Sequence, residues 1–135
     1  MLLITQLDGT EKRLYSLIGP LVMDPEVLKK NYNYPFKTSQ NYEWLVATDV
    51  KKVIGFMPVE KRSIHYIINN YYVPENREDV LESLLAKAVG LFSSHVPLVA
   101  VAFTEHEKLF LNYGFVVEKR WKLYVKMRKC LRTNE

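Results

Sequence analysis

The sequence predicts a single α/β domain, residues 1–135, built around a twisted sheet. Short runs of apolar or alternating residues, typical of strands, are interspersed with segments whose apolar residues recur at helical spacing. The composition is 48% hydrophobic, 25% charged and 13% aromatic, which is that of a folded globular protein. No internal repeat or linker interrupts the chain, and 135 residues are enough to bury a core.

The first half of the chain is expected to contain strands and two helices. Leu2–Leu7 is a predicted strand. From Thr10 onward apolar residues recur at helical spacing, and the pair Gly19-Pro20 should end or kink this helix. A second helix should follow, because Asp24 can cap it and Pro25 suits its first turn.

An irregular aromatic loop and a predicted hairpin come next. Residues 31–42 hold Tyr32, Tyr34, Phe36 and Tyr42 around a proline. Two strands joined by a polar turn are then expected at residues 44–48 and 53–59. Residues 64–73 should form a central strand with two apolar faces, which Asn69 and Asn70 interrupt.

The longest predicted helix runs from about Arg77 to Phe92. Its apolar stripe consists of Val80, Leu81, Leu84, Leu85, Ala88 and Leu91. Residues 97–103 should form a buried strand, and residues 104–107 a capping box for a helix that ends at Gly114. A last strand is expected in which Trp121, Leu123, Val125 and Met127 share one buried face.

Cysteine content and hydropathy bear on the cellular compartment. The one cysteine, Cys130, can form no intramolecular disulfide, and a reducing compartment fits best. Residues 1–7 carry no basic flank, and no stretch reaches the roughly 20 apolar residues that a spanning helix needs. We therefore expect a cytoplasmic protein with no membrane partner.

The order of these elements, together with three short motifs, resembles the GNAT acyltransferases over nearly the whole chain. The motifs are Val53-Ile54-Gly55-Phe56, Tyr71-Tyr72-Val73-Pro74, and Leu109 to Phe115 before a strand ending in Tyr124 to Met127. The resemblance implies an α+β fold with a mixed, mostly antiparallel sheet of about six or seven strands and helices on both faces. It also implies a V-shaped opening between the central strand and the next, parallel strand, where acetyl-CoA meets an amine.

In this family the pyrophosphate of acetyl-CoA rests on backbone amides at the start of the long helix, within a glycine-containing motif. This sequence departs from that motif. If Asn76 leads it, Asp79 and Leu81 stand at the glycine positions; if Arg77 leads, Val80 and Glu82 do. The resemblance places cofactor contacts at Tyr71, Val73, Asn76, Arg77, Val80 and Leu81.

Three acidic residues, Glu75, Glu78 and Asp79, surround this helix start. Each carboxylate at about 6 Å from a phosphate charge would cost roughly 3 kcal/mol at an effective dielectric near 20. An acidic first turn is also what any stable helix prefers, and Asn76 is a good helix cap. Both a weakened phosphate site and a purely structural helix start therefore stay open.

The catalytic groups implied by the resemblance are partly replaced. Many family members carry a tyrosine four residues before the glycine of the final Gly-Phe, and here that position is Phe110, which cannot protonate a thiolate. Tyr113 is the neighbouring candidate, with a core tyrosine as the alternative. The candidates for a general base are His65, Glu60 and His106, with ordered water or a structural histidine as alternatives.

Acceptor contacts are expected at Tyr34, Phe36 and Asn69. The aromatic loop corresponds in position to the region that often shapes the acceptor site, and it suits an aromatic or cationic substrate; hydrophobic anchoring is the alternative. An amide in a central strand needs a partner, which substrate or a local turn can supply. Paired cysteines and a Gly-x-Ser-x-Gly elbow are absent from the sequence, so no metal is expected.

The net charge of +4 is concentrated near the C-terminus. The basic residues there are Lys119, Arg120, Lys122, Lys126, Arg128, Lys129 and Arg132. A lysine-rich strand that resists pairing with other sheets explains them, and nucleic acid, although it is a third hypothesis, is not the expected partner.

The leading functional hypothesis is an N-acetyltransferase that moves an acetyl group from acetyl-CoA directly to a small-molecule or peptide amine. Backbone amides near residues 71–73 would polarise the thioester carbonyl. The alternative is a catalytically inactive GNAT-like binding module that has lost CoA binding, which the missing glycines motivate. Whether the chain forms a homodimer is left open.

Overall fold

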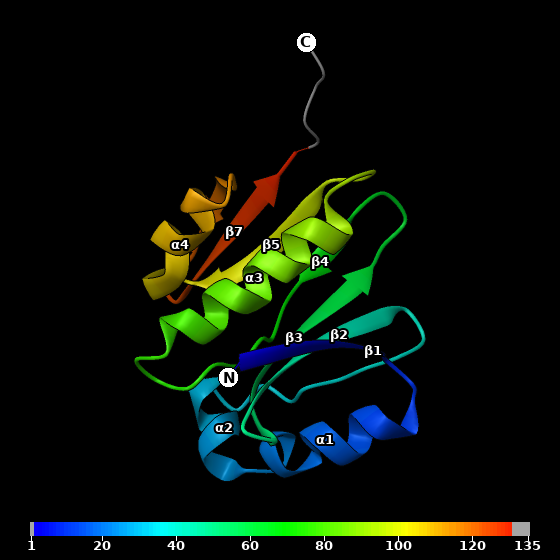
Figure 1. Cartoon of the computed structure of the whole chain (residues 1–135). Coiled ribbons are helices and arrows are strands. Elements are labelled where there is room, and N and C mark those ends of the chain that lie inside the picture. Colours follow the sequence, from blue (N-terminus) through cyan, green and yellow to red (C-terminus); the bar gives the residue numbers. More distant parts are fainter. Residues whose placement is uncertain (1, 131–135) are drawn as a thin grey trace.

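One seven-stranded sheet organises the computed structural model, which describes residues 2–130. The strands are β1 (Leu2–Asp8), β2 (Tyr42–Asp49), β3 (Lys52–Lys61), β4 (Tyr66–Ile68), β5 (Leu98–Phe103), β6 (Val116–Arg120) and β7 (Tyr124–Lys129). They lie in the order β1-β2-β3-β4-β5-β7-β6 (Figure 1), and every neighbouring pair is antiparallel except β4 and β5. The predicted mixed, mostly antiparallel sheet is confirmed.

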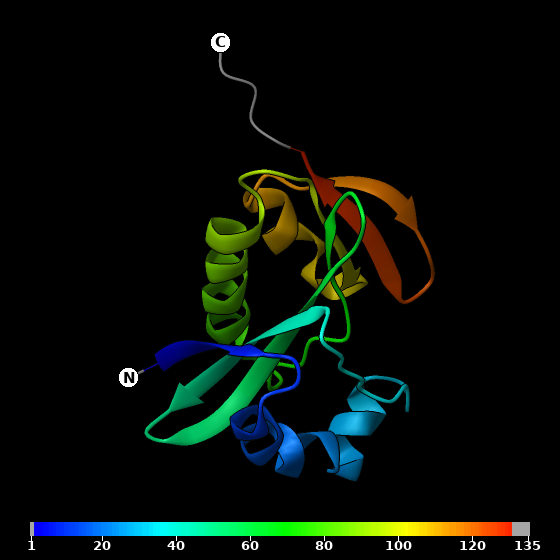
Figure 2. The ribbon, with the colours of Figure 1, turned by 90° about the vertical axis from the view of Figure 1, so that its right-hand side faces the viewer.

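Helices cover both faces of the sheet, as predicted. They are α1 (Lys12–Val22), α2 (Pro25–Lys30), α3 (Glu78–Phe92) and α4 (Glu107–Asn112), with a 3-10 turn, η1 (Thr104–His106), before α4. Figures 1 and 2 show α1 and α2 on the opposite side of the sheet from α3 and α4. Alternation along β2 explains this arrangement, since Trp44 and Val46 pack with α1 whereas Leu45 and Ala47 pack with α3. Among residues 2–130, the helices are all too short or too polar to cross a bilayer.

Local signals account for three of the predicted boundaries. The side chain of Asp24 caps α2 by accepting a 2.9 Å hydrogen bond from the Glu26 amide. In the β2–β3 hairpin, Val50 and Lys51 both have positive φ (49° and 65°), which matches the twist of the flanking strands. Beyond the end of α4, Gly114 has a φ of 91°, a conformation that glycine adopts without strain.

The helix α1 continues through the expected break. It runs to Val22 with Pro20 inside it, and the Met23 amide still donates to the Gly19 carbonyl at 3.1 Å. A proline removes only its own donated bond and disturbs one preceding carbonyl, so the next turn can still close. The sequence predicted that Gly19-Pro20 would either end or kink this helix, and the prediction that the helix ends there is wrong.

The central strand is shorter than predicted. β4 covers only residues 66–68, and the chain then bends at Asn70, whose φ is 58°. It resumes extended pairing at Tyr72, whose amide and carbonyl exchange 2.9 Å hydrogen bonds with Phe56 on β3. The predicted interruption at Asn69 and Asn70 is therefore observed, and after it the chain still pairs with β3 but no longer with β5.

Two details of the predicted helices are wrong. In α3, Leu91 is 40% exposed, and Phe92 instead is buried, with its ring 4.9 Å from that of Tyr66. The last turn of α3 directs the side chain at position 92 toward the sheet and leaves the side chain at position 91 partly exposed to solvent. The predicted capping box makes no side-chain cap bond, since the Glu107 carboxylate binds Arg120 instead, at 2.7 and 3.2 Å.

The predicted last strand also needs correction. Trp121 and Leu123 lie in the turn between β6 and β7 and are more than two-fifths exposed, whereas Val125 and Met127 are fully buried. The Trp121 amide donates to the Tyr124 carbonyl at 2.8 Å and closes this turn. Alternation alone could not separate a turn from one long strand.

Candidate active site

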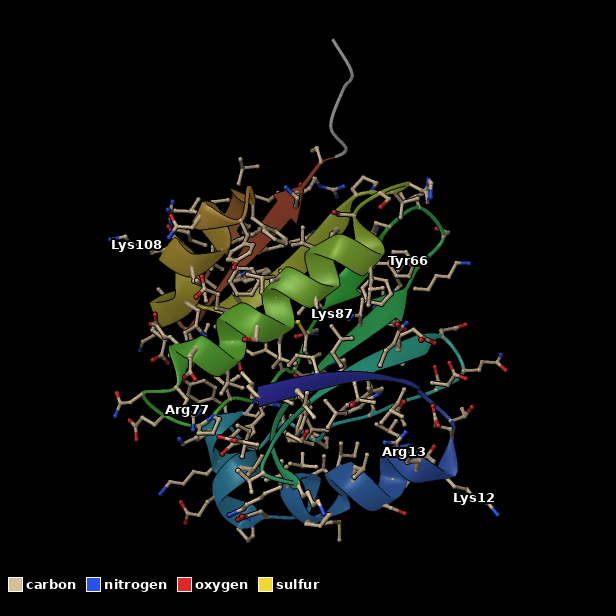
Figure 3. All side chains as sticks on the ribbon, viewed as in Figure 1. Lys12, Arg13, Tyr66, Arg77, Lys87 and Lys108 are labelled. Carbon is tan, nitrogen blue, oxygen red and sulfur yellow. The ribbon has the colours of Figure 1, made fainter. Side chains whose placement is uncertain are left out.

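The only parallel strand pair of the described sheet diverges into an opening. β4 and β5 pair from Tyr66↔Leu98 to Ile68↔Ala100, and then the Asn70 bend carries the chain away from β5 toward β3. A cavity of about 370 Å³ occupies the gap. It is lined by the segment 71–78, the end of β5, η1 and the end of α2. Figure 3 places Arg77, which lines the cavity, at the N-terminal end of α3, and Tyr66 near the other end of that helix.

A free strand edge faces the cavity. Because Tyr72 directs both its amide and its carbonyl at Phe56, the backbone groups of Tyr71 and Val73 must point the opposite way, toward β5. Within residues 2–130, no backbone–backbone hydrogen bond occupies those groups. The cavity therefore offers the donors and acceptors with which a ligand can pair as an added strand.

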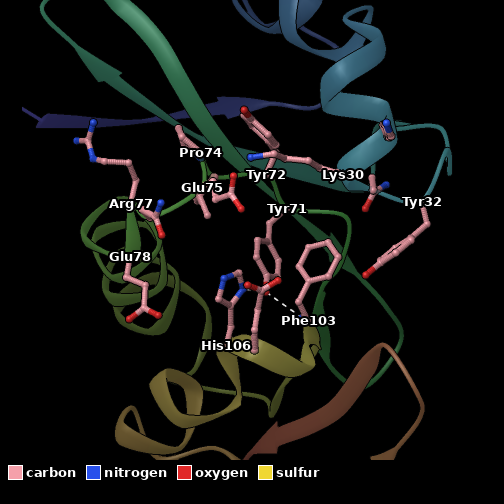
Figure 4. Close-up of a pocket in the computed structure, with 15 residues that line it drawn as sticks. Lys30, Tyr32, Tyr71, Tyr72, Pro74, Glu75, Arg77, Glu78, Phe103 and His106 are labelled. Atoms are coloured by element: carbon pink, nitrogen blue, oxygen red, sulfur yellow. Dashed lines mark hydrogen bonds between the residues drawn. The ribbon is translucent and has the colours of Figure 1, made fainter.

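Tyr71 forms the floor of the cavity and joins the two diverging strands. Its side chain is 2% exposed, and its hydroxyl oxygen accepts a 3.0 Å hydrogen bond from the Phe103 amide at the end of β5. The same hydroxyl lies 2.6 Å from Nδ1 of His106 (Figure 4). Burial raises the pKa of Tyr71 far above its ordinary value, so the phenol stays protonated.

His106 lines the cavity beside Tyr71. Burial lowers its pKa, and the carboxylates of Glu105 and Glu78 offset only part of this effect. The imidazole is therefore neutral near pH 7 and acts through its hydrogen bonds rather than through a charge.

Stability at acidic pH should report this shift. An unfolded histidine has a pKa of about 6.5. The pKa of His106 is lower in the folded protein, so the unfolded state binds the proton more tightly. The contribution of His106 to the unfolding free energy is therefore complete above about pH 6.5 and is lost as the pH falls toward the folded pKa. His65 acts in the same sense, because burial and then Arg128 lower its pKa. We expect His106→Gln to flatten the fall in unfolding free energy below about pH 6.5, measured with urea; an unchanged slope would contradict this assignment.

The start of α3 is occupied by its own side chains. The Arg77 guanidinium binds the Asp79 carboxylate at 2.9 and 3.1 Å and lies 3.9 Å from Asp49. Arg77 holds the pKa of Asp79 below its usual range. The first turn of α3, on which a pyrophosphate would rest, thus already carries a carboxylate. Asn76 has a φ of 62° and turns the chain before the helix rather than capping it.

Aromatic rings form one wall of the cavity. The centroid of Phe103 lies 5.1 Å from that of Tyr124 and 6.1 Å from that of Tyr32, and Tyr32 is 52% exposed. Three carboxylates and three cations share the remaining lining: Glu75, Glu78, Glu105, Lys29, Lys30 and Arg77. A ligand that carries both phosphates and an amine would meet partners for each charge.

Asn31 lines the cavity at the end of α2, a position that the sequence analysis did not single out. It is 3% exposed and donates through Nδ2 to the Tyr34 carbonyl (2.9 Å) and to Oδ1 of Asn70 (3.3 Å). These bonds tie the aromatic loop to the bend in the central strand. A polar residue directly after a capped helix was the signal available in the sequence.

The predicted cofactor residues divide into two groups. Tyr71, Val73, Asn76 and Arg77 line the cavity. Val80 and Leu81 are fully buried in the core between α3 and the sheet, so their side chains face away from it. The Val80 amide also donates to the Arg77 carbonyl, at 3.1 Å.

The first predicted catalytic residues lie elsewhere. His65 lines a second cavity of about 250 Å³, together with His95, at the opposite end of β4. Glu60 pairs with Arg62 at 2.8 Å on β3, and the Tyr113 hydroxyl donates to Glu82 at 3.2 Å. Of the titratable candidates, the structure places only His106 in the cavity between β4 and β5.

The predicted acceptor residues do not line this cavity either. Tyr34 is exposed, and Phe36 packs edge-on against Phe56 with centroids 5.0 Å apart. Oδ1 of Asn69 accepts the Asn70 amide at 2.9 Å, so a local turn satisfies it. Tyr32 is the residue of the aromatic loop that reaches the cavity.

Three of the described basic residues near the C-terminus, Arg120, Lys126 and Arg128, form ion pairs. β6 is the edge strand, and the Glu118 carboxylate lies 2.8 Å from Arg128 and 3.7 Å from Lys126. Arg120 binds Glu107. Arg132 lies outside the described residues. These basic residues therefore form ion pairs between β6 and β7 and with helix α4, in addition to placing positive charge near the edge of the sheet.

Comparison with known proteins gives similarity in structure. No protein-family model matches the chain, and no curated protein sequence matches it significantly. Escherichia coli ElaA superposes with a TM-score of 0.71 and 16% identity, over 96% of this chain and 99% of that one. An acyl-CoA N-acyltransferase from Pseudomonas aeruginosa gives 0.69 and 17%, over 96% and 100%.

A GNAT family acetyltransferase from Elizabethkingia anophelis, solved with acetyl-CoA bound, superposes with a TM-score of 0.56 and 15% identity, over 96% of this chain and 98% of that one. These identities are too low to transfer an activity, but the superpositions span almost the whole of each chain. They agree with the sheet order, the single parallel pair and the helices on both faces. The chain therefore has the fold of the GNAT N-acetyltransferases.

Proposed function

We propose that this chain is an N-acetyltransferase that moves an acetyl group from acetyl-CoA directly to an amine. The observation that carries the proposal is the free strand edge of residues 71–73, which faces a cavity between the two parallel strands. The fold supports it, since the structural neighbours include acyltransferases, one of them with acetyl-CoA bound.

The lining fits the acyl and pantetheine part of acetyl-CoA. The backbone groups of Tyr71 and Val73 can pair with the pantetheine amides as a strand would. The rings of Tyr71 and Phe103 form apolar walls that exclude water from the acyl group. When bound, acetyl-CoA supplies an activated acyl group, and these residues orient it.

The pyrophosphate part fits less well. Asp79 lies in the first turn of α3, and its carboxylate repels an anion bound there. Lys29 and Lys30 at the end of α2 and Arg77 line the same cavity and supply compensating charge. We therefore propose that the cofactor is held mainly by its pantetheine part, with weaker contacts to phosphate.

The remaining wall suits a cationic acceptor. Tyr32 and Phe103 present aromatic faces, and Glu75 and Glu105 supply negative charge within the same cavity. Ammonium groups bind favourably to such combinations. A carboxylate of the lining, or an ordered water, takes the proton that the amine must lose before it attacks.

Thermal unfolding with and without millimolar acetyl-CoA tests the proposal. Saturation at about 100 times the dissociation constant should add roughly 2.7 kcal/mol to the unfolding free energy. 3′-Phospho-ADP, which keeps the phosphates of CoA but lacks its pantetheine part, is the control for simple anion binding. Transfer of labelled acetyl to a panel of small amines and lysine peptides should follow. If acetyl-CoA gives no shift, the proposed function is wrong.

Replacing Asp79 with asparagine should tighten acetyl-CoA binding. The change removes a carboxylate from the first turn of α3 and releases Arg77 from its ion pair. We expect an affinity gain of about tenfold, less than the unscreened repulsion would give, because the site is open to solvent. Isothermal titration measures it. The matched control is Glu82→Gln, also on α3, whose carboxylate binds Tyr113; an equal gain for both variants would attribute the effect to net charge alone.

One alternative function is supported by a specific observation. Phe110, at the position of the family's tyrosine, is fully buried in the core, and Asp79 places a carboxylate at the usual anion site. A non-catalytic binding module would retain the fold and the cavity while losing both. It predicts neither stabilisation by acetyl-CoA nor acetyl transfer to any amine of the panel.

A further inference from the structure

The hydrogen bond between Tyr71 and His106 determines which proton the cavity presents. The Tyr71 hydroxyl oxygen already accepts the Phe103 amide at 3.0 Å, and it lies 2.6 Å from Nδ1 of His106. Two arrangements of the short bond are conceivable: the phenol donates to Nδ1, or a protonated Nδ1 donates to the phenol oxygen.

Burial selects between these arrangements. If Nδ1 carried the proton, the hydroxyl hydrogen of Tyr71 would lie in the core with no acceptor, because the side chain is 2% exposed. An unmade hydrogen bond of a buried donor is costly, so the phenol donates to an unprotonated Nδ1. In the neutral imidazole the remaining proton then sits on Nε2.

The protonated nitrogen faces the cavity. His106 lines it, and with Nδ1 directed at Tyr71 the other side of the ring points away from Tyr71, toward the space beside Glu78 (Figure 4). Among residues 2–130 the hydrogen bonds described for His106 involve Nδ1 alone. The site therefore presents a fixed N–H donor next to the free edge of residues 71–73.

This geometry is unsuited to a general base. A base needs a free lone pair, but Nε2 carries the proton and Nδ1 is occupied by the phenol. A neutral N–H in a partly dry site is instead suited to a carbonyl oxygen on which negative charge develops, because the donor needs no reorientation during the reaction.

We propose that His106 donates its Nε2–H to the carbonyl oxygen of the bound acyl group, and that Tyr71 is the positioning residue that holds His106 in this tautomer. The inference rests on the proposed acetyltransferase function. His106 gains and loses no proton in the step. The amine nitrogen bonds to the carbonyl carbon, the carbon–sulfur bond breaks, the sulfur keeps the electron pair, and the proton of the amine passes to a carboxylate or water.

The tautomer can be measured without any ligand. Long-range ¹H–¹⁵N correlation spectra of the whole protein should show His106 with a protonated Nε2 and an unprotonated Nδ1 near neutral pH. In Tyr71→Phe, which retains the buried ring, the spectra should show a mixture of tautomers and a raised pKa for His106, because the bond to its neutral form is lost. A protonated Nδ1 in the unsubstituted protein would overturn the inference.

The donor itself is tested with acetonyl-CoA, a ketone analogue with a ¹³C-labelled carbonyl that cannot transfer its acyl group. In the unsubstituted protein, the carbonyl stretch of the bound analogue should lie at lower frequency than in water-free solvent. The frequency should rise in His106→Ala. In His106→Gln it should return toward the value of the unsubstituted protein, because the glutamine amide can donate from a similar position. If the analogue binds and His106→Ala leaves the frequency unchanged, this inference fails while the acetyltransferase proposal stands. Absence of binding overturns both.

Turnover provides a second readout once the panel identifies an acceptor amine. His106→Ala should lower kcat about 100-fold with little change in KM for acetyl-CoA, and Tyr71→Phe should lower it about tenfold. Equal losses in kcat and binding would indicate a structural role only. Thermal unfolding of each variant checks that it is folded at the assay temperature.

Discussion

Replacing Leu85 with alanine should lower the unfolding free energy by about 3–5 kcal/mol, whereas the same replacement at Leu91 should cost about 0.5 kcal/mol or less. Both residues lie on α3, but Leu85 is fully buried in the core with the sheet and α4, and Leu91 is 40% exposed. The cost at Leu85 combines lost transfer free energy with the cavity left behind, and at Leu91 neither is large.

Urea denaturation of the two variants measures this difference. The pair is matched in residue type, helix and substitution, so helix propensity contributes equally to both. Helical spacing alone places Leu91 on the same apolar stripe as Leu85, so the experiment also distinguishes the packing in the structure from the sequence pattern. Comparable losses for the two variants would show that position 91 is packed in solution.

Replacing Gly55 with alanine should cost about 2–3 kcal/mol and weaken acetyl-CoA binding at least tenfold. A Cβ at position 55 would lie 2.8 Å from the Tyr72 carbonyl oxygen and 3.2 Å from Cγ1 of Val80. The Tyr72 carbonyl belongs to the backbone and cannot rotate away as a flexible side chain can. The hydrogen-bonded pairing of Phe56 with Tyr72 must therefore shift to make room for the added Cβ. That pairing is what turns residues 71 and 73 toward the cavity.

Gly90 provides the control for this variant. A Cβ at that position would meet no atom within 4 Å, and the residue lies inside α3. We expect Gly90→Ala to raise the unfolding free energy by about 0.5–1 kcal/mol through helix propensity and to leave acetyl-CoA binding unchanged. Denaturation and titration calorimetry report the two effects separately. A Gly55→Ala protein of full stability and affinity would contradict the role given to the close approach.

If both the acetyltransferase proposal and the role of His106 hold, the chain performs its chemistry with fewer of the family's motifs than the fold suggests. Phe110 fills the core at the position where the resemblance to the family implies a tyrosine, and Asp79 places a carboxylate in the helix turn where the resemblance implies phosphate binding. The Tyr71–His106 pair would then supply, from the segment after β4 and from η1, a polar group that α4 lacks at Phe110.

Elements with strong local signals could be predicted from the sequence. Asp24 and Pro25 mark the start of α2, Gly114 follows the end of α4, and alternation along β2 assigns its residues to two faces. Such signals act over a few residues, where hydrogen bonding and backbone sterics decide the outcome. The resemblance in element order then sufficed for the sheet and for the opening between the parallel strands.

Side-chain partners could not be predicted in this way. Glu107 satisfied the pattern of a capping box, yet Arg120, thirteen residues away, binds its carboxylate. His65 and His106 looked equally eligible in the sequence, and the direction of β4 places one at each end of the strand. Contacts between distant segments depend on how elements pack, which local spacing does not encode.

By itself, then, the sequence determined the elements, the two apolar faces of the sheet and the likeness to one fold, because periodicity and turn chemistry are local properties. Only the tertiary structure decided the site. The bend at Asn70 separates the chain after β4 from β5. The pairing of Tyr72 with Phe56, next to Gly55, leaves the backbone groups of Tyr71 and Val73 to face the cavity. The buried Tyr71 hydroxyl lies 2.6 Å from Nδ1 of His106. Each of these depends on groups that meet only after the chain has packed.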